Sequence, residues 1–205
     1  MPRKSVVGAL LGLITLAGLS GGNLAVSAQP AKDVVQDADV LRKNLAMTPG
    51  PMHQLLARLE GDWFFETTTF TVPGGAPERA QGEAQKRLIF GGRFLEESWR
   101  GEKLGAPWQG RSLLGWDNLA KEFQGVFLDD LTTAMIAARG RLEADGAAVT
   151  FAAETKNPFT DQLEQLRLVL RLTDENHHLI EIWAKAPKQP ERRLQETRYS
   201  RKARG

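Results

Sequence analysis

Cysteine is absent from the 205 residues. This absence excludes disulfide bonds, thiolate catalysis, cysteine-based metal sites and a lipid-modified cysteine behind an export signal. The sequence also contains no H-E-x-x-H motif and no Gly-rich phosphate loop, and Ser112 does not stand in a G-x-S-x-G turn. No familiar catalytic motif therefore indicates a reaction.

Long hydrophobic runs are missing after the first residues. Arg3 and Lys4 precede an apolar run of 14 residues, 6–19, and the small residues of Val26-Ser27-Ala28 follow it. This layout predicts a secretory signal peptide over 1–28, cleaved after Ala28, and hence a periplasmic or secreted protein. A membrane anchor is the alternative, but a spanning helix needs about 20 apolar residues.

An excess of charge of either sign is lacking in the predicted mature chain. The full sequence has 27 Lys and Arg against 25 Asp and Glu, and cleavage removes Arg3 and Lys4. The basic pI therefore belongs largely to the export signal and does not indicate a nucleic-acid partner. No transmembrane segment is expected after cleavage, and the oligomeric state stays open.

Two short helical patterns precede the main domain. Residues 29–51 form a leader in which Asp33 caps a possible helix, and the Pro and Gly residues of 48–51 end it. From Met52 the apolar residues follow a spacing of three and four up to Leu59, which predicts a two-turn helix that stops at Gly61.

The hydrophobic period changes from 3.6 to 2 at Trp63, and Trp63, Phe65 and Thr67 fall on one face. Turn signals then separate further strands of mostly seven to eleven residues. The predicted strands cover 63–71, 81–90, 93–100, 108–116, 122–129, 135–142, 148–155, 162–172, 177–185 and 192–201.

The strand pattern predicts an all-β domain over 52–202 with a tail at 203–205. Short turns join the strands, and residues 165–172 alternate between a polar, solvent-facing side and an apolar side. Both features favour an up-and-down antiparallel barrel of about ten strands over a sandwich. Such a barrel is wider than the eight-strand size that side chains just fill, so a cavity is expected.

Gly61-Asp62-Trp63 after a short helix resembles the G-x-W opening of lipocalins and other calycin barrels. In those proteins the tryptophan closes the barrel floor under a basic residue from a late strand. The resemblance implies that Trp63 is structural and that Arg198 or Arg201 covers it, with Arg198 taken as the structural partner.

Three later blocks are more specific. Phe90 to Glu96 resembles the LGGR-F-L-E block of a secreted bacterial family catalogued as domain of unknown function 1579. Residues 110–133 resemble its block around L-L-G-Y-D-N, and residues 196–202 its closing E-x-x-Y-x-R-K. Trp116 replaces the usual tyrosine and Phe127 the usual tryptophan. The resemblance implies a calycin-like barrel and export, and brings no established reaction.

Two carboxylates are candidates for a functional site. Glu97 shares a strand face with Arg93 and Trp99, and Asp129 shares one with Phe127. Turned inward among aromatic rings, a carboxylate would have a raised pKa that suits acid-base work. Neutralisation by Arg93, or a turn-capping role for Asp129, are the structural alternatives.

The three histidines give little support for a metal or a cofactor. His177 and His178 are adjacent in a strand, so they point to opposite faces and cannot both ligate one metal. His53, on the predicted helix, has no partner at metal-ligand spacing. We therefore expect no metal and no cofactor, with the histidines on the surface; a haem held by one histidine, as in nitric-oxide-binding calycin relatives, is a further alternative.

The leading hypothesis is non-catalytic binding of a small, largely apolar or amphipathic molecule in the barrel cavity. In it Arg93, Glu97 and Asp129 orient the ligand's polar end, while Trp99, Trp116 and Thr67 line the pocket. One alternative is a cofactor-free isomerase or hydrolase with Glu97 or Asp129 as base. The other is a protein-interaction module whose barrel is filled by its own side chains.

Overall fold

The alternating pattern that begins near Trp63 forms a strand in the computed structural model of the chain. The structure describes residues 30–70, 75–103, 105–157 and 160–203, with side chains from Asp37 onward. The predicted signal peptide and its cleavage site at Ala28 lie outside the described residues. The chain divides into two units, Met1–Asp39 and Val40–Gly205, and the barrel belongs entirely to the second.

Two helices precede ten strands in the described part of the chain. Their bounds are α1 Pro30–Met47, α2 Pro51–Ala57, β1 Gly61–Thr69, β2 Glu78–Ile89, β3 Phe94–Lys103, β4 Ala106–Asp117, β5 Glu122–Asp129, β6 Ile136–Leu142, β7 Ala148–Lys156, β8 Leu163–Leu172, β9 His177–Lys185 and β10 Arg192–Arg201.

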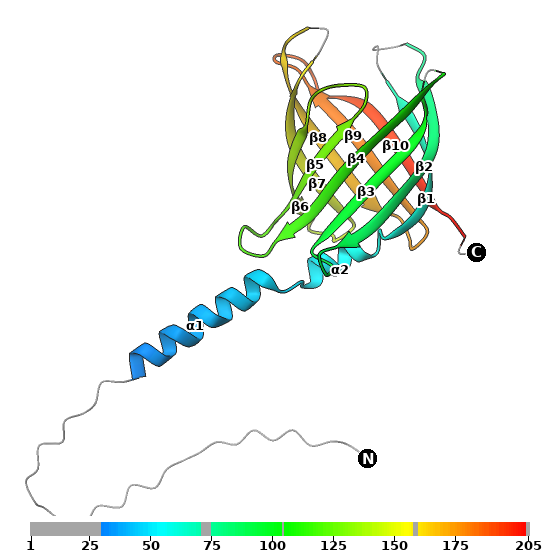
Figure 1. The fold of residues 1–205 in the computed structure, drawn as a ribbon. Helices are drawn as coiled ribbons and strands as arrows, with labels where there is room; N and C mark the ends of the chain where they lie inside the picture. The colour runs from blue at the N-terminus through cyan, green and yellow to red at the C-terminus, as the bar shows by residue number, and fades with distance from the viewer. Residues whose placement is uncertain (1–29, 71–74, 104, 158–159, 204–205) are drawn as a thin grey trace, which may run out of the picture. The chain divides into compact units, whose positions relative to one another are not determined.

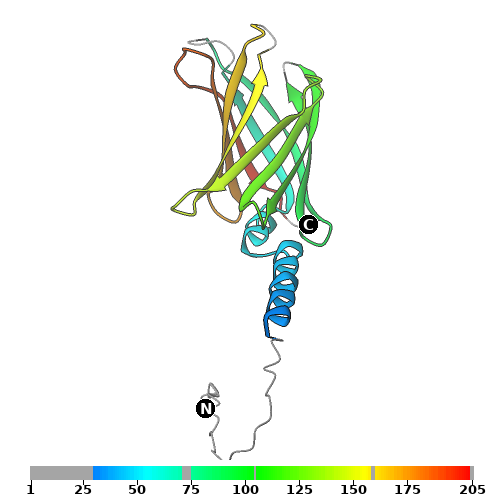
Figure 2. The same ribbon diagram turned by 90° about the vertical axis from the view of Figure 1, so that its left-hand side faces the viewer.

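The ten strands form a closed barrel in which each strand pairs with its neighbours in sequence (Figures 1 and 2). All pairs are antiparallel, and β1 closes the barrel on β10 with Trp63 opposite Arg201. Closure leaves no free sheet edge for another chain to pair with. The prediction of an all-β, up-and-down antiparallel barrel of about ten strands is confirmed.

The predicted strand positions agree closely with the structure, because the turns carry strong signals. The ranges 122–129, 177–185 and 192–201 match β5, β9 and β10. At the β2–β3 turn, Phe90, Gly91 and Gly92 all have a positive φ of 50°, 67° and 82°. Glycine adopts this conformation without steric cost, so the dipeptide Gly91-Gly92 indicates the turn in the sequence.

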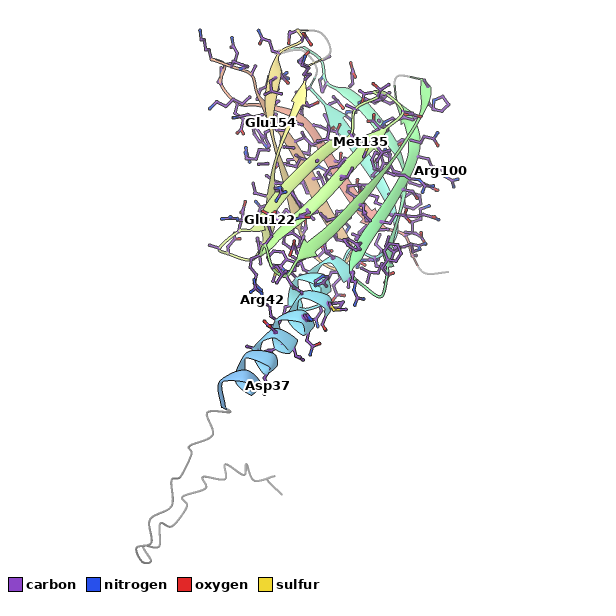
Figure 3. All side chains as sticks on the ribbon, turned by 60° about the vertical axis from the view of Figure 1, so that its left-hand side comes forward. Asp37, Arg42, Arg100, Glu122, Met135 and Glu154 are labelled. Carbon is purple, nitrogen blue, oxygen red and sulfur yellow. The ribbon has the colours of Figure 1, made fainter. Side chains whose placement is uncertain are left out.

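Alternation along the strands places the core inside the barrel. On β1, Trp63, Phe65 and Thr67 are buried, whereas Phe64 and Glu66 are exposed. The exposed side chains of Arg100 and Glu154 lie on the outer face (Figure 3).

Helix α2 covers one end of the barrel (Figure 1). Leu56, at the end of this helix, and Leu59 are almost fully buried in one cluster with Leu95, Leu114 and Phe123. The apolar spacing from Met52 to Leu59 therefore marks the residues that seal this end of the core.

The leader helix α1 begins at Pro30, so the predicted start with Asp33 as its cap is wrong. Proline suits the first turn of a helix because its missing N–H would have no partner there. Within the described residues, neither helix is long and apolar enough to cross a membrane.

Candidate site in the barrel interior

A cavity of about 220 Å³ lies inside the barrel. Aromatic and aliphatic side chains form most of its wall, including Phe65, Trp99 and Trp108. The polar residues Thr67, Glu97, Asp129, Thr132, Gln195, Thr197 and Tyr199 complete the lining. An apolar pocket with a few converging polar groups is the usual composition of a small-molecule site.

A buried ion pair lies beside the cavity. The Lys86 Nζ atom is 3.2 Å from Oε1 of Glu97, and the two side chains are only 2% and 9% exposed. The hydroxyl of Ser112 donates a hydrogen bond to Oε2 of Glu97 over 3.3 Å. Oε2 of Glu97 therefore accepts a hydrogen bond, and Oε1 faces the ammonium group of Lys86 without a hydrogen bond among the described residues. The ion pair offsets the buried charge.

Burial lowers the pKa of Lys86, and the neighbouring Glu97 carboxylate acts in the opposite direction. Lys86 also lies 2.9 Å from Nε2 of His178 and 4.1 Å from the ring centroid of Tyr199. The lysine is thus enclosed by an acid, an imidazole and an aromatic face, which together offset part of the cost of burying its charge.

His178 belongs to an aromatic stack beneath the cavity. Its ring is stacked on Tyr199 with centroids 4.2 Å apart, and it meets Trp63 in a T-shaped contact at 4.3 Å. Burial lowers the pKa of His178 far below its ordinary value, and the charges of Lys86 and Arg201 lower it further. The neutral imidazole therefore accepts the lysine's hydrogen bond at Nε2.

Tyr199 links this stack to the cavity wall. Burial raises the pKa of Tyr199 well above its ordinary value, and the charge and side-chain hydrogen bond of Glu97 add to that effect. The phenol therefore stays neutral, so its hydroxyl is a donor beside the Glu97 carboxylate.

The barrel floor is built around Trp63, which is 1% exposed. Its indole nitrogen donates to the carbonyl of Leu59 over 2.9 Å. The guanidinium of Arg201 lies 4.1 Å above the ring and donates to the backbone carbonyls of Arg58, Glu60 and Glu175. This is the arrangement that the G-x-W resemblance implies for a tryptophan on a barrel floor.

The choice of Arg198 as the structural partner of Trp63 is wrong. Arg198 lies on the outer face, where it pairs with Glu196. Successive residues of β10 point to opposite faces, so Tyr199 and Arg201 share the inward direction and Arg198 does not. With Tyr199 assigned to the inward face, the two-residue alternation of β10 would have predicted Arg201 as the residue that covers Trp63.

Four of the six predicted ligand-binding residues line the cavity, namely Thr67, Glu97, Trp99 and Asp129. Arg93 and Trp116 do not, which corrects both predictions. Arg93 lies in the turn before β3 and donates to the carbonyls of Phe90 and Met47. It does not neutralise Glu97, because Lys86 has that role.

Trp116 lies toward the end of the barrel that α2 covers. Its ring makes a T-shaped contact with Phe123, and its indole nitrogen donates to Asn118 over 3.1 Å. Asn118 in turn donates to the carbonyls of Leu45 and Thr48. Trp116 therefore helps to fix the segment before α2.

Sequence reasoning missed Lys86, His178 and Tyr199 as members of the site. The alternation of β2 indicated that Lys86 points into the barrel, because it falls on the same face as the buried Ala80 and Ala84. A lysine on an apolar face needs a buried partner. The expectation that the histidines are on the surface is wrong for His178 and His53, which are 2% and 6% exposed.

None of the three histidines fits a haem or metal role. His178 is occupied by Lys86, and His177 is exposed beside Asp174. His53 accepts a hydrogen bond from the backbone N–H of Gly50 at the start of α2. None of them lines the cavity. Within the described ranges, no group of three or more His, Asp or Glu side chains could hold a metal ion.

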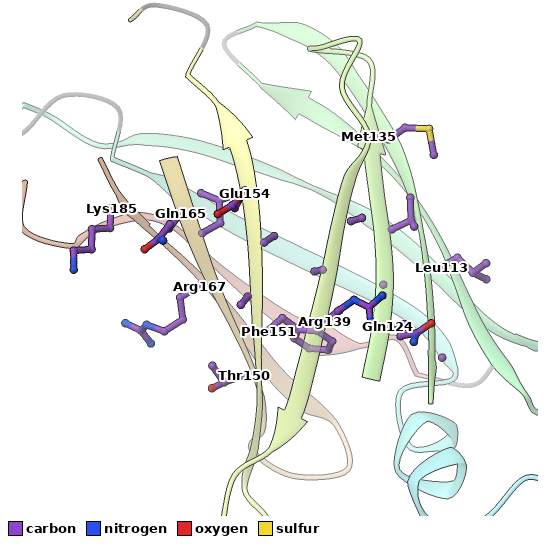
Figure 4. Close-up of a pocket in the computed structure, with 18 of the residues that line it drawn as sticks. Leu113, Gln124, Met135, Arg139, Thr150, Phe151, Glu154, Gln165, Arg167 and Lys185 are labelled. Carbon is purple, nitrogen blue, oxygen red and sulfur yellow. The ribbon is translucent and has the colours of Figure 1, made fainter. Parts of the chain in front are cut away.

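A larger groove of about 1060 Å³ lies across β4 to β9 (Figure 4). Its rim is charged, and two of its arginines are paired: Arg139 with Glu122, and Arg167 with Glu191. Paired, exposed charges need no ligand to satisfy them. The smaller inner cavity is therefore the better candidate, because four of its polar residues, Thr67, Glu97, Thr197 and Tyr199, are buried.

The chain belongs to the family described as "Protein of unknown function (DUF1579)", which it matches over residues 48–201. The barrel is consistent with the calycin-like fold that the sequence resemblance implied. No curated protein matches the chain.

Among solved structures, the crystal structure of Rv2717c from M. tuberculosis is similar to this chain, with a TM-score of 0.57 and 16% identity. The likeness covers 76% of this chain and 100% of that one. At this identity the likeness shows the fold alone.

Proposed function

We propose that this protein binds a small, largely apolar molecule in the cavity of its barrel, without chemistry. The observation that carries the proposal is the cavity of about 220 Å³ inside the barrel, with a mostly apolar wall and a few polar groups. Sites for drug-sized ligands measure about 300–1,000 Å³, so this cavity favours a smaller ligand.

The catalytic alternative has less support from the geometry. A general base must be free to accept a proton from the substrate. Glu97 faces Lys86 with one oxygen and accepts a hydrogen bond from Ser112 with the other. Asp129 already accepts a hydrogen bond from the backbone N–H of Leu131, as a turn cap does. A barrel filled by its own side chains has less support too, because a cavity of about 220 Å³ is left between them.

The proposal includes export, predicted from residues 1–28. N-terminal sequencing of the protein from its own host tests it, and the expected first residue is Gln29. An unprocessed N-terminus would contradict export.

Native mass spectrometry of protein purified from its own host tests ligand binding. We expect an adduct that disappears after extraction with organic solvent. The variant Ile182→Trp, which adds bulk to the cavity wall, should lose the adduct. Ala137→Trp adds the same ring at an exposed position and should keep it. Circular dichroism checks that both variants fold.

Loss of the adduct in Ala137→Trp alone, or in neither variant, would place the bound molecule outside the cavity, because Ala137 lines the larger groove. A bare mass in the wild-type protein would contradict tight binding.

A further inference from the structure

Two hydrogen-bond donors of the cavity wall lack an acceptor. The indole nitrogens of Trp99 and Trp108 are buried and have no hydrogen-bond partner among the described residues. Both side chains line the cavity, and Trp108 is only 7% exposed. Buried indole N–H groups usually find a partner. Trp63 on the barrel floor donates to Leu59, whereas the indole nitrogen of Trp183, outside the cavity lining, also has no partner among the described residues.

Glycine at position 110 allows the ring of Trp99 to lie over β4. Gly110 is opposite Trp99 on β3 and opposite Asp129 on β5. A Cβ atom at position 110 would lie 2.1 Å from Cζ2 and 2.5 Å from Cε2 of Trp99. Since Cε2 is bonded to the indole nitrogen, the edge of the ring that carries the N–H lies over this glycine.

The ring of Trp108 is held by its neighbours. It meets Phe65 in a T-shaped contact with centroids 5.9 Å apart, and it lies 6.1 Å from the ring of Trp99. The two donors therefore belong to adjacent rings that are fixed by packing. Such preorganised donors lose little entropy when a ligand binds.

The charges of the cavity wall are negative. Glu97 and Asp129 line the cavity, and among the described lining residues there is no lysine or arginine. Lys86 does not line it, because it lies against Glu97 and over the ring of Tyr199. A ligand carboxylate would therefore meet the carboxylate of Asp129 and the ion-paired Glu97. The Nζ atom of Lys103 lies outside the lining, 5.3 Å from the ring centroid of Trp108.

We propose that the ligand is an uncharged molecule with a hydrogen-bond acceptor oxygen, such as a ketone, ester or ether, which the indole N–H groups of Trp99 and Trp108 hold. This inference rests on the proposed function, because it names the chemical class that the cavity takes. An anionic ligand such as a fatty acid is disfavoured by Asp129, whereas the charge of Glu97 is offset by Lys86. An ammonium ligand would pair with Asp129 but would leave both indole donors without an acceptor.

Four small probes of similar size separate these classes: cyclohexanone, methylenecyclohexane, cyclohexanecarboxylate and cyclohexylammonium. The ketone and the alkene have nearly the same shape and differ in the acceptor oxygen. Each is titrated into ¹⁵N-labelled protein, and the indole N–H signals are followed by NMR. Five tryptophans give five such signals, which single Trp→Phe variants assign.

Cyclohexanone should move the signals of Trp99 and Trp108 downfield and leave that of Trp63 in place. It should also bind roughly 3- to 10-fold more tightly than the alkene, which is the effect expected of one net hydrogen bond. Trp108→Phe keeps an aromatic ring and removes the donor. This variant should weaken ketone binding by a similar factor and leave alkene binding unchanged.

Each other outcome overturns a stated part of the account. Equal affinity for ketone and alkene would overturn the inference, and so would tightest binding of the carboxylate or of the ammonium. In these cases blockage by Ile182→Trp would still support the cavity as a binding site. If none of the four probes binds, the proposed function fails together with the inference.

Discussion

Lys86 and Glu97 form an ion pair inside the barrel, with Nζ and Oε1 3.2 Å apart. The two residues lie opposite each other on β2 and β3. Both side chains are buried, so each satisfies a charge that would otherwise be costly in the core. The pair supports the inner end of the cavity, where Glu97 is part of the wall.

Removing one member of this pair should cost more than removing both. Lys86→Met or Glu97→Gln alone is expected to lower the free energy of unfolding by about 3–5 kcal/mol, because an uncompensated buried group remains. The double variant K86M/E97Q should lose less than the sum of the two. Urea unfolding measures all three values, and strictly additive losses would contradict an energetic coupling.

Arg201 should matter more for stability than Arg198. Arg201→Lys removes the guanidinium that covers Trp63 and donates to three backbone carbonyls. We expect a loss of about 2–4 kcal/mol, since hydrogen bonds from charged groups contribute about 1.5–3 kcal/mol each. Arg198→Lys is the matched control on the outer face and should change stability by less than about 0.5 kcal/mol. Equal effects in thermal unfolding would argue against Arg201 as the partner of Trp63.

His178 should make the protein sensitive to acid. Its pKa in the folded state is lowered by burial, whereas a histidine in the unfolded chain titrates near pH 6.5. Below that pH the unfolded state takes up a proton that folded His178 does not. The contribution of His178 to the free energy of unfolding is therefore fully present above about pH 6.5. It is lost as the pH falls, by up to about 1.4 kcal/mol per pH unit.

The comparison of wild type with His178→Gln isolates this effect, because the lowered pKa of His53 acts in both proteins. Urea unfolding between pH 7 and about pH 5 should show a shallower pH dependence in the variant. His177→Gln, at an exposed position, should keep the slope of the wild type. Parallel curves for all three proteins would rule out a neutral, buried His178.

Gly110→Ala should disturb Trp99. The new Cβ atom would overlap the indole ring at 2.1 Å and the carbonyl oxygen of Leu128 at 2.6 Å. Such overpacking typically costs about 1–3 kcal/mol. Gly50→Ala adds the same methyl group where no atom lies within 4 Å, so it should cost no more than about 1 kcal/mol, the difference between Gly and Ala at the N-cap of α2, and should leave the Trp99 signal in place. An unchanged Trp99 indole signal in the Gly110→Ala variant would contradict the close contact.

The fold was largely predictable because its signals are local. The apolar alternation from Trp63 and the glycines of the β2–β3 turn specify strands and their ends without reference to distant residues. The site was less predictable, since it joins side chains from several strands. Glu97 and Trp99 could be identified because they share one strand face. Lys86 and His178 are 92 positions apart, and the closure of the barrel brings them together.

Arg93 shows where the assignment of residues to a strand face by two-residue spacing fails. Two-residue spacing groups it with Glu97 and Trp99, but β3 begins at Phe94. The turn before the strand has its own backbone geometry, so the alternation does not extend to Arg93. Trp116 follows the alternation, yet it lies farther toward the end that α2 covers, and sequence alone does not give the depth of a residue along the barrel.

The central claim is that the inner cavity holds a small molecule. The most direct test is the electron density between Trp99 and Tyr199 in crystals of protein purified from its own host. The account predicts continuous density for one compact molecule whose oxygen lies within hydrogen-bond distance of the indole nitrogens. A cavity that contains only separate water molecules, or that side chains fill, would contradict it.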